Sequence, residues 1–337
     1  MRPLLKNVGD QTIVITGASS GIGLATARLA AGRGARVVLA ARSADGLRTA
    51  ADRIRDRGGE IATVVADVAS EHDVRRIAEI AVHRFGGFDT WINNAGVSVY
   101  GPLDKVPLED QRQVFETNYW GVVHGSLVAL EHLRHRRGAI INVGSILSER
   151  AFPLQGAYSA SKHAIKGFTD ALRAEVMHEG LPVSITLVKP AGIDTPYPEH
   201  AANHLPMAPR NPPPMYAPDV VAKAILHTAE HPLREVTVGG SGRLLETLDH
   251  WLPGLTEAIM ARVLPARQQS SEPAGERGPD GLHAAAGDAR ERSGKDYLVF
   301  ERSAYTWAAL NPSVVAMGLA ALAGVVLGRA GGRRRRG

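Results

Sequence analysis

The sequence predicts an α/β fold, in which about seven strands form a doubly wound parallel sheet with helices on both faces. Short runs rich in β-branched residues recur along residues 11–240, and longer stretches with helical periodicity separate them. This alternation predicts successive strand–helix units, which build a parallel sheet. The runs are almost continuously apolar, as expected of strands that are covered on both faces.

The predicted elements follow one another in a regular order. The predicted strands are residues 12–16, 35–40, 61–66, 88–93, 138–144, 183–188 and 234–239. The intervening stretches carry apolar residues at helical spacing, and residues 241–265 predict one or two further helices. The chain has 337 residues, 44% of them hydrophobic, which is enough for one large domain and an appendage. We expect the domain to span residues 1–265.

The composition narrows the possible chemistry and partners. The chain contains no cysteine, which excludes disulfides, thiolate metal sites and cysteine nucleophiles and fits a reducing compartment. None of the 13 histidines stands in a metal-ligand motif, so we expect no metal site. The formal net charge is +5, but five arginines lie among the last nine residues. The rest of the chain is therefore not basic, which argues against nucleic-acid binding.

The C-terminal region changes character after residue 265. Residues 266–300 are rich in Gly, Ala, Arg, Asp and Ser, so we expect a disordered linker there. Residues 301–337 contain the uncharged stretch 304–328, which the arginines follow. We expect this stretch to form an apolar, membrane-associated helix. The alternative is a helix that docks on its own domain or on a partner.

The membrane prediction carries a problem of orientation. The N-terminus shows no secretory signal, so we expect the main domain to be cytoplasmic. The most apolar residues, 313–328, span about 24 Å as a helix, whereas the hydrocarbon core of a bilayer is about 30 Å thick. A single span would also place the arginines outside, against the positive-inside tendency. A shallow or re-entrant segment would avoid both conflicts.

The first functional motif is the glycine-rich turn TGASSGIG, residues 16–23. It follows a predicted strand and opens a predicted helix, which is the context of dinucleotide-binding turns. Its glycines allow the backbone to approach a pyrophosphate, and the helix N-terminus offers free N–H groups to that anion. The spacing is G-x-x-x-G-x-G rather than G-x-G-x-x-G, and a purely structural turn is the alternative. We expect the cofactor to contact Gly17, Ser19, Ser20, Gly21, Ile22 and Gly23.

Arg42 follows the second strand, where an acidic residue would bind the ribose 2′-hydroxyl of NAD. An arginine at this place can grip a 2′-phosphate with a fork of donors. We therefore expect NADP(H) to be preferred over NAD(H). The alternative is a solvated arginine at a strand end.

Two further strand ends complete the predicted cofactor site. Asp67, which precedes Val68, is placed after the third strand to reach an adenine amino group, although Asp is also a common helix N-cap. The run NNAG at 93–96 ends the fourth strand, at the sheet edge where ligands bind in such folds. Asn and Gly also form ordinary turns. From this run we expect Asn94, Ala95 and Gly96 to contact the cofactor.

Tyr158 and Lys162 lie four residues apart on a predicted helix, so their side chains share one face. A tyrosine normally titrates near pH 10, and a nearby ammonium lowers that pKa. The pair can then act as a general acid or base close to neutrality. Ser145 ends the fifth strand and can hydrogen-bond a substrate oxygen. Asn118, in mid-helix, can hold a water beside Lys162. Alone, Y-x-x-x-K is more often a surface pair.

Together, the glycine turn, the NNAG run and these four residues resemble the short-chain dehydrogenase/reductase family over about residues 8–262. The resemblance implies a Rossmann-type fold and a working enzyme, because all four positions of the family's catalytic tetrad are filled. It implies that Tyr158 transfers a proton, that Lys162 holds the nicotinamide ribose and lowers the pKa of the tyrosine, that Ser145 positions the substrate oxygen and that Asn118 keeps a proton-relay water.

The segment 189–196, KPAGIDTP, also resembles the family's segment after the sixth strand. The resemblance implies that Pro190, Ile193 and Thr195 meet the nicotinamide end of the cofactor. The common form has Gly directly after the Pro, whereas this sequence has Ala191.

We therefore predict an NADP(H)-dependent oxidoreductase that interconverts a secondary alcohol and a carbonyl. In this family the segment 195–218 covers the substrate. Its apolar residues Leu205, Met207, Met215 and Tyr216 predict a lipophilic substrate.

The family usually pairs subunits through the helices that carry Asn118 and Tyr158, so we expect a homo-oligomer. One alternative is a membrane-tethered cofactor-binding or scaffold protein without catalysis. Another is an epimerase or dehydratase, although such enzymes usually carry TGxxGxxG spacing.

Overall fold

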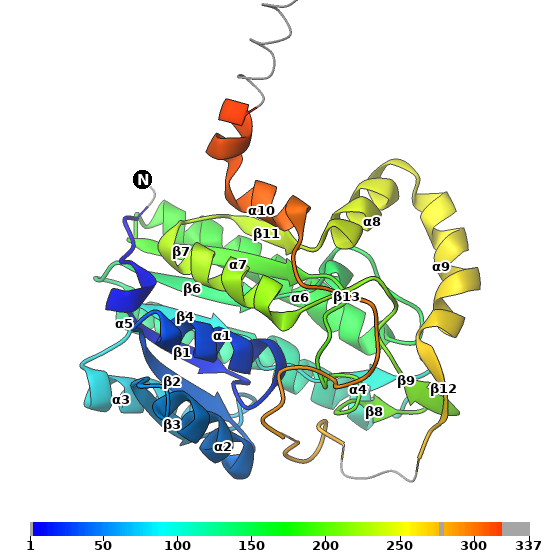
Figure 1. Cartoon of the computed structure of the whole chain (residues 1–337), viewed down its shortest axis with the longest axis horizontal. Coiled ribbons are helices and arrows are strands. Elements are labelled where there is room, and N and C mark those ends of the chain that lie inside the picture. Colours follow the sequence, from blue (N-terminus) through cyan, green and yellow to red (C-terminus); the bar gives the residue numbers. More distant parts are fainter. Residues whose placement is uncertain (1–2, 276–279, 287, 319–337) are drawn as a thin grey trace, which may run out of the picture.

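The core of the protein is a seven-stranded parallel sheet in a computed structural model, which describes residues 3–275, 280–286 and 288–318. The strand order is β11-β7-β6-β4-β1-β2-β3 (Figure 1). The chain thus winds outwards from β1 on one side and from β4 on the other, which confirms the predicted doubly wound fold. The strands are β1 Thr12–Thr16, β2 Arg36–Ala41, β3 Ile61–Val65, β4 Thr90–Asn93, β6 Gly138–Val143, β7 Val183–Pro190 and β11 Glu235–Val238.

Helices cover both faces of the sheet. One layer contains α1 (Gly21–Gly32), α2 (Ala44–Arg55) and α7 (Pro218–Glu230), and the other contains α3 (Glu71–Phe85), α5 (Gly121–Leu133) and α6 (Gly156–His178). Successive side chains of a strand point to opposite faces, so each strand serves both layers. In β1, Ile13 and Ile15 belong to the first apolar core and Val14 to the second. This explains why the strands read as continuous apolar runs.

Local sequence sets several helix ends. Ser43 and Ser70 cap α2 and α3 by accepting hydrogen bonds from the N–H groups of Gly46 and Asp73. Gly86 ends α3 in the left-handed conformation, with φ of 77°.

Smaller elements surround the carboxyl edge of the sheet. Three short pairs form there: β5 (Val99–Tyr100) with β8 (Ala202–Asn203), β9 (Met207–Pro209) with β12 (Gln269–Pro273), and β10 (Met215–Tyr216) with β13 (Val299–Phe300). The remaining helical elements are the 3-10 turns Val8–Asp10 and Ile146–Ser148, α4 (Leu108–Phe115), the π-helical turn Glu116–Trp120, α8 (Gly240–Trp251), α9 (Pro253–Arg267) and α10 (Ala304–Leu310).

A buried polar network fixes the strand ends nearest the site. Asn93 of β4 donates from Nδ2 to Asn142 of β6 at 2.8 Å and to Ser126 of α5 at 3.0 Å. Asn142 in turn donates to Thr169 of α6 at 2.9 Å. Because every donor is partnered, these bonds specify how β4, β6, α5 and α6 meet. The first Asn of the NNAG run therefore has a structural role.

The structure differs from the disordered linker that we expected at residues 266–300. Residues up to 267 complete α9, and β12 and β13 pair with strands of the main domain. Leu282 is fully buried, and Ser293 donates to Asp194 at 2.5 Å. The composition suggested too few apolar anchors, but backbone pairing and a few small buried side chains hold the described part of this segment in place.

The apolar C-terminal segment is described only in part. Residues 304–310 form α10, residues 312–318 are helical, and residues 319–337 lie outside the described residues. Across the described ranges, no helix has both the length and the apolar character needed to cross a membrane.

Candidate active site

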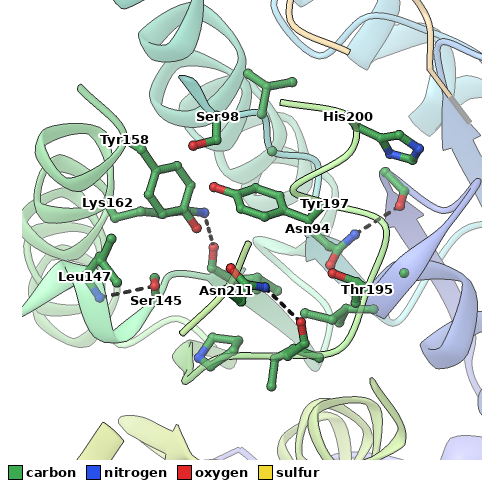
Figure 2. A pocket seen from close by; sticks show the side chains of 18 of the residues that line it. Asn94, Ser98, Ser145, Leu147, Tyr158, Lys162, Thr195, Tyr197, His200 and Asn211 are labelled. Atoms are coloured by element: carbon green, nitrogen blue, oxygen red, sulfur yellow. Dashed lines mark hydrogen bonds between the residues drawn. The ribbon is translucent and has the colours of Figure 1, made fainter. Parts of the chain in front are cut away.

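A cavity of about 390 Å³ opens at the carboxyl ends of the central strands. Tyr158, Lys162 and Ser145 lie on one side of it in Figure 2, opposite Asn94 and Thr195. Ser145 lines the cavity, and so do all the predicted cofactor-site residues except Gly23: Gly17, Ser19, Ser20, Gly21, Ile22, Arg42, Asp67, Val68, Asn94, Ala95, Gly96, Tyr158, Lys162, Pro190, Ile193 and Thr195.

The glycine turn between β1 and α1 is closely packed. Gly17 has φ of 65°, and a Cβ there would lie 2.7 Å from the Ala95 Cα. Gly23 does not reach the cavity; a Cβ there would lie 2.3 Å from the Gly17 carbonyl oxygen. A side chain at either position would push the turn out of shape.

Asn94 holds this turn from the neighbouring strand. Its Nδ2 donates to the carbonyls of Thr16 and Gly17 at 3.0 and 3.1 Å. The Thr16 hydroxyl accepts hydrogen bonds from the N–H groups of Asn94 and Ala95 in return. The second Asn of the NNAG run thus shapes the cofactor side of the cavity through its side chain.

The start of α1 lies close to the loop after β7. A Cβ on Gly21 would lie 3.4 Å from the Thr195 Cβ, which is van der Waals contact. Both residues line the cavity. A helix N-terminus that faces a cavity suits a phosphate group, so the residues present fit a dinucleotide cofactor.

Arg42 lies where the sequence predicts, but its donors are engaged. Its guanidinium donates to the carbonyls of Gly281 and Leu282, the latter at 3.2 Å. The Gly21 N–H likewise donates to the Arg290 carbonyl at 2.8 Å. A C-terminal segment therefore borders the cofactor half of the cavity. The sequence alone did not predict that this segment lies at the site.

Asp67 keeps part of its carboxylate for a local turn. Its Oδ1 accepts a hydrogen bond from the Ala69 N–H at 3.0 Å. It lines the cavity together with Val68.

Lys162 is buried beside Tyr158. Its Nζ donates to the Val143 carbonyl at 2.9 Å and lies 5.5 Å from the centre of the tyrosine ring. Burial lowers the pKa of this lysine to about 8.

The pKa of Tyr158 moves in the opposite direction from our expectation. Burial raises it above 10, and the neighbouring hydroxyls of Tyr197 and Ser145 oppose that rise. The expectation considered only the ammonium charge, whereas desolvation of the phenolate is the larger effect. The phenol consequently holds its proton at neutral pH in the protein as described.

Asn118 lies in the π-helical turn and does not line the cavity. Its Oδ1 accepts from the Val97 N–H at 2.8 Å, and its Nδ2 donates to the Val97 carbonyl and to Ser161, both at 3.0 Å. The side chain thus braces the chain after Gly96, and its predicted water-holding role stays a prediction. π-helical turns inside α-helices often occur at functional sites.

Tyr197 is a cavity residue that the sequence analysis did not single out. Its ring centre lies 5.6 Å from that of Tyr158, and the two rings, tilted by 58°, lie next to each other in Figure 2. Its hydroxyl is buried, and the described residues offer it no partner within hydrogen-bonding geometry. Its position right after Thr195-Pro196 was the only signal that could have pointed to it.

The apolar residues that line the cavity are not the four that the sequence predicted. Leu205, Met207, Met215 and Tyr216 do not line it; Leu205, Met215 and Tyr216 are buried elsewhere in the domain. Apolar side chains that do line the cavity include Ile146, Leu147, Phe152, Leu245 and Leu264, together with Pro196, Tyr197, Pro212, Pro213 and Pro214 of the proline-rich loop. Helices α8 and α9 therefore supply part of the apolar wall beside the proline-rich loop, which contributes residues other than the four expected.

Comparison with known proteins agrees with this geometry. The sequence model of the family described as short chain dehydrogenase matches residues 11–205. The uncharacterized oxidoreductase YxnA of Bacillus subtilis (strain 168) is 42% identical over 334 residues, which cover 98% of this chain and 93% of that protein. The 11-beta-hydroxysteroid dehydrogenase A of Sesamum indicum is 38% identical over 192 residues, which cover 56% of this chain and 54% of that protein.

Solved structures show the same fold. A short chain dehydrogenase/reductase from Burkholderia phymatum, in complex with NAD, is 26% identical with a TM-score of 0.67 and covers 76% of this chain and 96% of its own. An alcohol dehydrogenase from the archaeon Thermococcus sibiricus, complexed with 5-hydroxy-NADP, is 26% identical with a TM-score of 0.60 and covers 68% and 95%. By its family match, relatives and fold, the chain belongs to the short-chain dehydrogenase/reductase family of oxidoreductases, which act on CH–OH groups with NAD(P).

Proposed function

We propose that this protein is an NADP(H)-dependent oxidoreductase that interconverts a secondary alcohol and a carbonyl in a lipophilic substrate. The observation that carries the proposal is a single cavity lined by the glycine turn and by Ser145, Tyr158 and Lys162. Interconversion of an alcohol and a carbonyl by hydride transfer needs a dinucleotide and, at the same place, a group that can donate or accept a proton. A bound nicotinamide supplies or accepts the hydride, and residues of this chain orient the substrate and move its proton.

Tyr158 would transfer the proton at its phenol oxygen. Burial keeps its pKa above the ordinary value, so the phenol is protonated at neutral pH and ready to donate to a carbonyl oxygen during reduction. Ser145 would hydrogen-bond the same oxygen and stabilise its developing negative charge. In the oxidative direction, the ammonium of Lys162 would stabilise the phenolate.

The preference for NADP(H) is supported by Arg42, which lines the cofactor half of the cavity. A guanidinium fork matches a phosphate group in charge and geometry better than it matches a ribose hydroxyl. The solved relatives carry either NAD or a modified NADP, so the family leaves this choice to residues such as Arg42.

A lipophilic substrate is supported by the wall of the cavity near Tyr158. Phe152, Leu245 and Leu264 give this part of the wall an apolar surface, and the polar groups of Ser145, Tyr158 and Lys162 line the same cavity. Apolar walls with few, well-placed polar groups favour apolar ligands. One relative is a hydroxysteroid dehydrogenase by name, so a steroid alcohol or ketone is a reasonable first member of a substrate panel.

We also propose that the C-terminal region associates with a membrane surface. Leu244, Leu248 and Trp251 form an exposed stripe at helical spacing on α8, and Trp251 is 74% exposed. Leu255, Ile259 and Val263 continue the exposed apolar surface on α9. Two such stripes suit the boundary between lipid headgroups and acyl chains, and the uncharged segment 304–328 follows them in the sequence. The same two helices also line the cavity through Leu245 and Leu264, so a lipophilic substrate would have a short path from lipid to the site.

A homo-oligomer through α5 and α6 is also proposed. Leu127 on α5 and Met177 on α6 are large apolar side chains that are exposed in the single chain. Light scattering coupled to gel filtration would test it, and a monomer at micromolar concentration would contradict it.

The enzymatic proposal is tested by NADPH oxidation with a panel of apolar ketones, aldehydes and steroids. The wild-type protein should turn over at least one of them, and Tyr158→Phe should lose turnover by several orders of magnitude because it removes the transferable proton. The variant should still bind NADPH, which excludes misfolding as the cause. NADPH binding without turnover of any member of the panel would favour the scaffold alternative, and absence of both would contradict the proposed cofactor.

A further inference from the structure

A C-terminal segment borders the cofactor half of the cavity. We call it the strap; it comprises residues 280–286 and 288–293. Gly281 and Ala286 of the strap line the cavity. In Figure 1 this orange part of the chain lies beside α2 and then returns towards α10. Leu282 and Ala289 are buried, so apolar packing holds the strap at two points.

Carbonyl oxygens of the strap bind donors that the proposed function assigns to cofactor phosphates. Arg42 donates to both Gly281 and Leu282, and the Gly21 N–H donates to Arg290. A pyrophosphate is common to NAD(H) and NADP(H), so competition at Gly21 does not distinguish them. The 2′-phosphate belongs to NADP(H) alone, and Arg42 is the donor that would meet it.

Other contacts tie the strap to the loop after β7 and to α4. The Ser293 hydroxyl donates to Asp194 at 2.5 Å, and Arg290 pairs with Glu199 at 2.7 Å. His283 contacts the Asp110 carboxylate at 2.8 Å. The Gly281 N–H also donates to the His200 carbonyl at 2.7 Å, and Leu282 is fully buried. Loss of the two Arg42 bonds would therefore weaken the hold on Gly281 and Leu282 without detaching the strap.

The two kinds of acceptor differ in strength. A carbonyl oxygen is neutral, whereas a phosphate is an anion, and charge-assisted hydrogen bonds are about twice as strong as neutral ones. The ribose 2′-hydroxyl of NAD(H) offers no such charge. A 2′-phosphate can therefore replace the strap carbonyls on Arg42, and a 2′-hydroxyl cannot.

We propose that the strap is a cofactor-specificity element. The 2′-phosphate of NADP(H) replaces the carbonyls of Gly281 and Leu282 as the hydrogen-bond acceptor of Arg42, and this loosens the strap there. NAD(H) leaves these two hydrogen bonds in place. The inference rests on the proposed NADP(H) site. It adds that the affinity for NADP(H), but not for NAD(H), depends on how firmly the strap is held at Gly281 and Leu282.

Leu282→Ala tests the proposal in the full chain. Leu282 packs with Val99, Val106 and Val114 and is fully buried, so its truncation weakens the strap next to Arg42 without touching the cofactor donors. The dissociation constant of NADPH should fall about fivefold or more, in the usual range of coupling between sites, and that of NADH should stay unchanged. The matched control is Leu298→Ala, at an exposed leucine outside the strap, which should change neither constant.

A double variant and an exchange measurement complete the test. In an Arg42→Ala background, Leu282→Ala should no longer tighten NADPH binding, because the shared group is gone. In the wild-type protein, amide hydrogen exchange of residues 281–286 should be faster with saturating NADPH than with saturating NADH. Unchanged or weaker NADPH binding by Leu282→Ala, equal tightening of both cofactors, or equal exchange with both would overturn the proposal. If wild-type protein does not bind NADPH at all, the proposed cofactor fails instead.

Discussion

Replacing Lys162 with methionine is expected to stabilise the fold while it removes activity. The side chain is only 4% exposed, and its main polar contact is a neutral acceptor, the Val143 carbonyl. Burial lowers the pKa of the amine from 10.5 to about 8. The ammonium that the proposed chemistry needs therefore destabilises the folded state at neutral pH.

The size of this effect follows from the pKa. The amine is protonated in both the folded and the unfolded chain at pH 7, and its lowered pKa costs the folded state about 3 kcal/mol. Methionine has a similar length and no charge, so Lys162→Met removes that cost. The substitution also leaves the Val143 carbonyl without its hydrogen-bond donor, which reduces the gain in stability by about 1 kcal/mol. We expect a net gain of about 2 kcal/mol in the free energy of unfolding.

The same reasoning predicts how the gain depends on pH. Between pH 8 and 10.5 the unfolded wild-type chain binds more protons at this lysine than the folded chain does, so the stability of the wild type rises relative to the variant. The advantage of Lys162→Met should shrink across this window and be absent above about pH 10.5. Urea unfolding of both proteins at pH 7 and 10.5 measures it, and NADPH oxidation measures the loss of activity.

Lys189 supplies a matched control. It is also a buried lysine, at 1% exposure, but its Nζ lies 2.8 Å from Glu149, 3.2 Å from Glu235 and 3.4 Å from Glu246. Burial would lower its pKa, yet these carboxylates outweigh burial and raise it. Lys189→Met removes the buried cation that these three carboxylates share, although Lys166 still lies 3.7 Å from Glu149 and Arg243 lies 3.2 Å from Glu246, and it should cost about 3 kcal/mol. Destabilisation by Lys162→Met at pH 7, or an equal effect at both pH values, would refute the reasoning.

Four further changes test the site and its surroundings. Arg42→Asp should raise the dissociation constant of NADPH far more than that of NADH, and equal losses in a binding titration would mean that Arg42 does not bind the 2′-phosphate. Tyr197→Phe should raise KM more than it lowers kcat if this phenol orients the substrate; an unchanged KM would contradict that role. Gly125→Ala would place a Cβ 2.0 Å from the Asn93 Oδ1 and should destabilise the fold by about 2 kcal/mol in urea unfolding, whereas a neutral effect would mean that the polar network adapts. The full chain should float with anionic liposomes, and Trp251→Ser should weaken flotation; a wild-type protein that stays with the soluble fraction would contradict membrane association.

Much of the fold and site is local in origin, and the sequence predicted it for that reason. Each central strand is a short apolar run between turns, and seven such runs become the seven strands of the sheet. The carboxyl ends of parallel strands meet at one edge of the sheet. Functional residues at strand ends and helix starts are therefore predicted to lie close together. Gly17, Asn94, Ser145 and Tyr158 therefore reach one cavity wherever the strands form in this order.

The sequence by itself thus determined the sheet, its family and the side chains that gather at its edge. The tertiary structure alone decided three things. The pKa of Tyr158 rises because burial is a property of the packed molecule. Leu245 of α8 and Leu264 of α9 join the apolar cavity wall, whereas Leu205, Met215 and Tyr216 of the proline-rich loop pack elsewhere. The strap reaches Arg42 and Gly21 through backbone carbonyls, which every residue possesses, so this contact leaves no mark in the sequence.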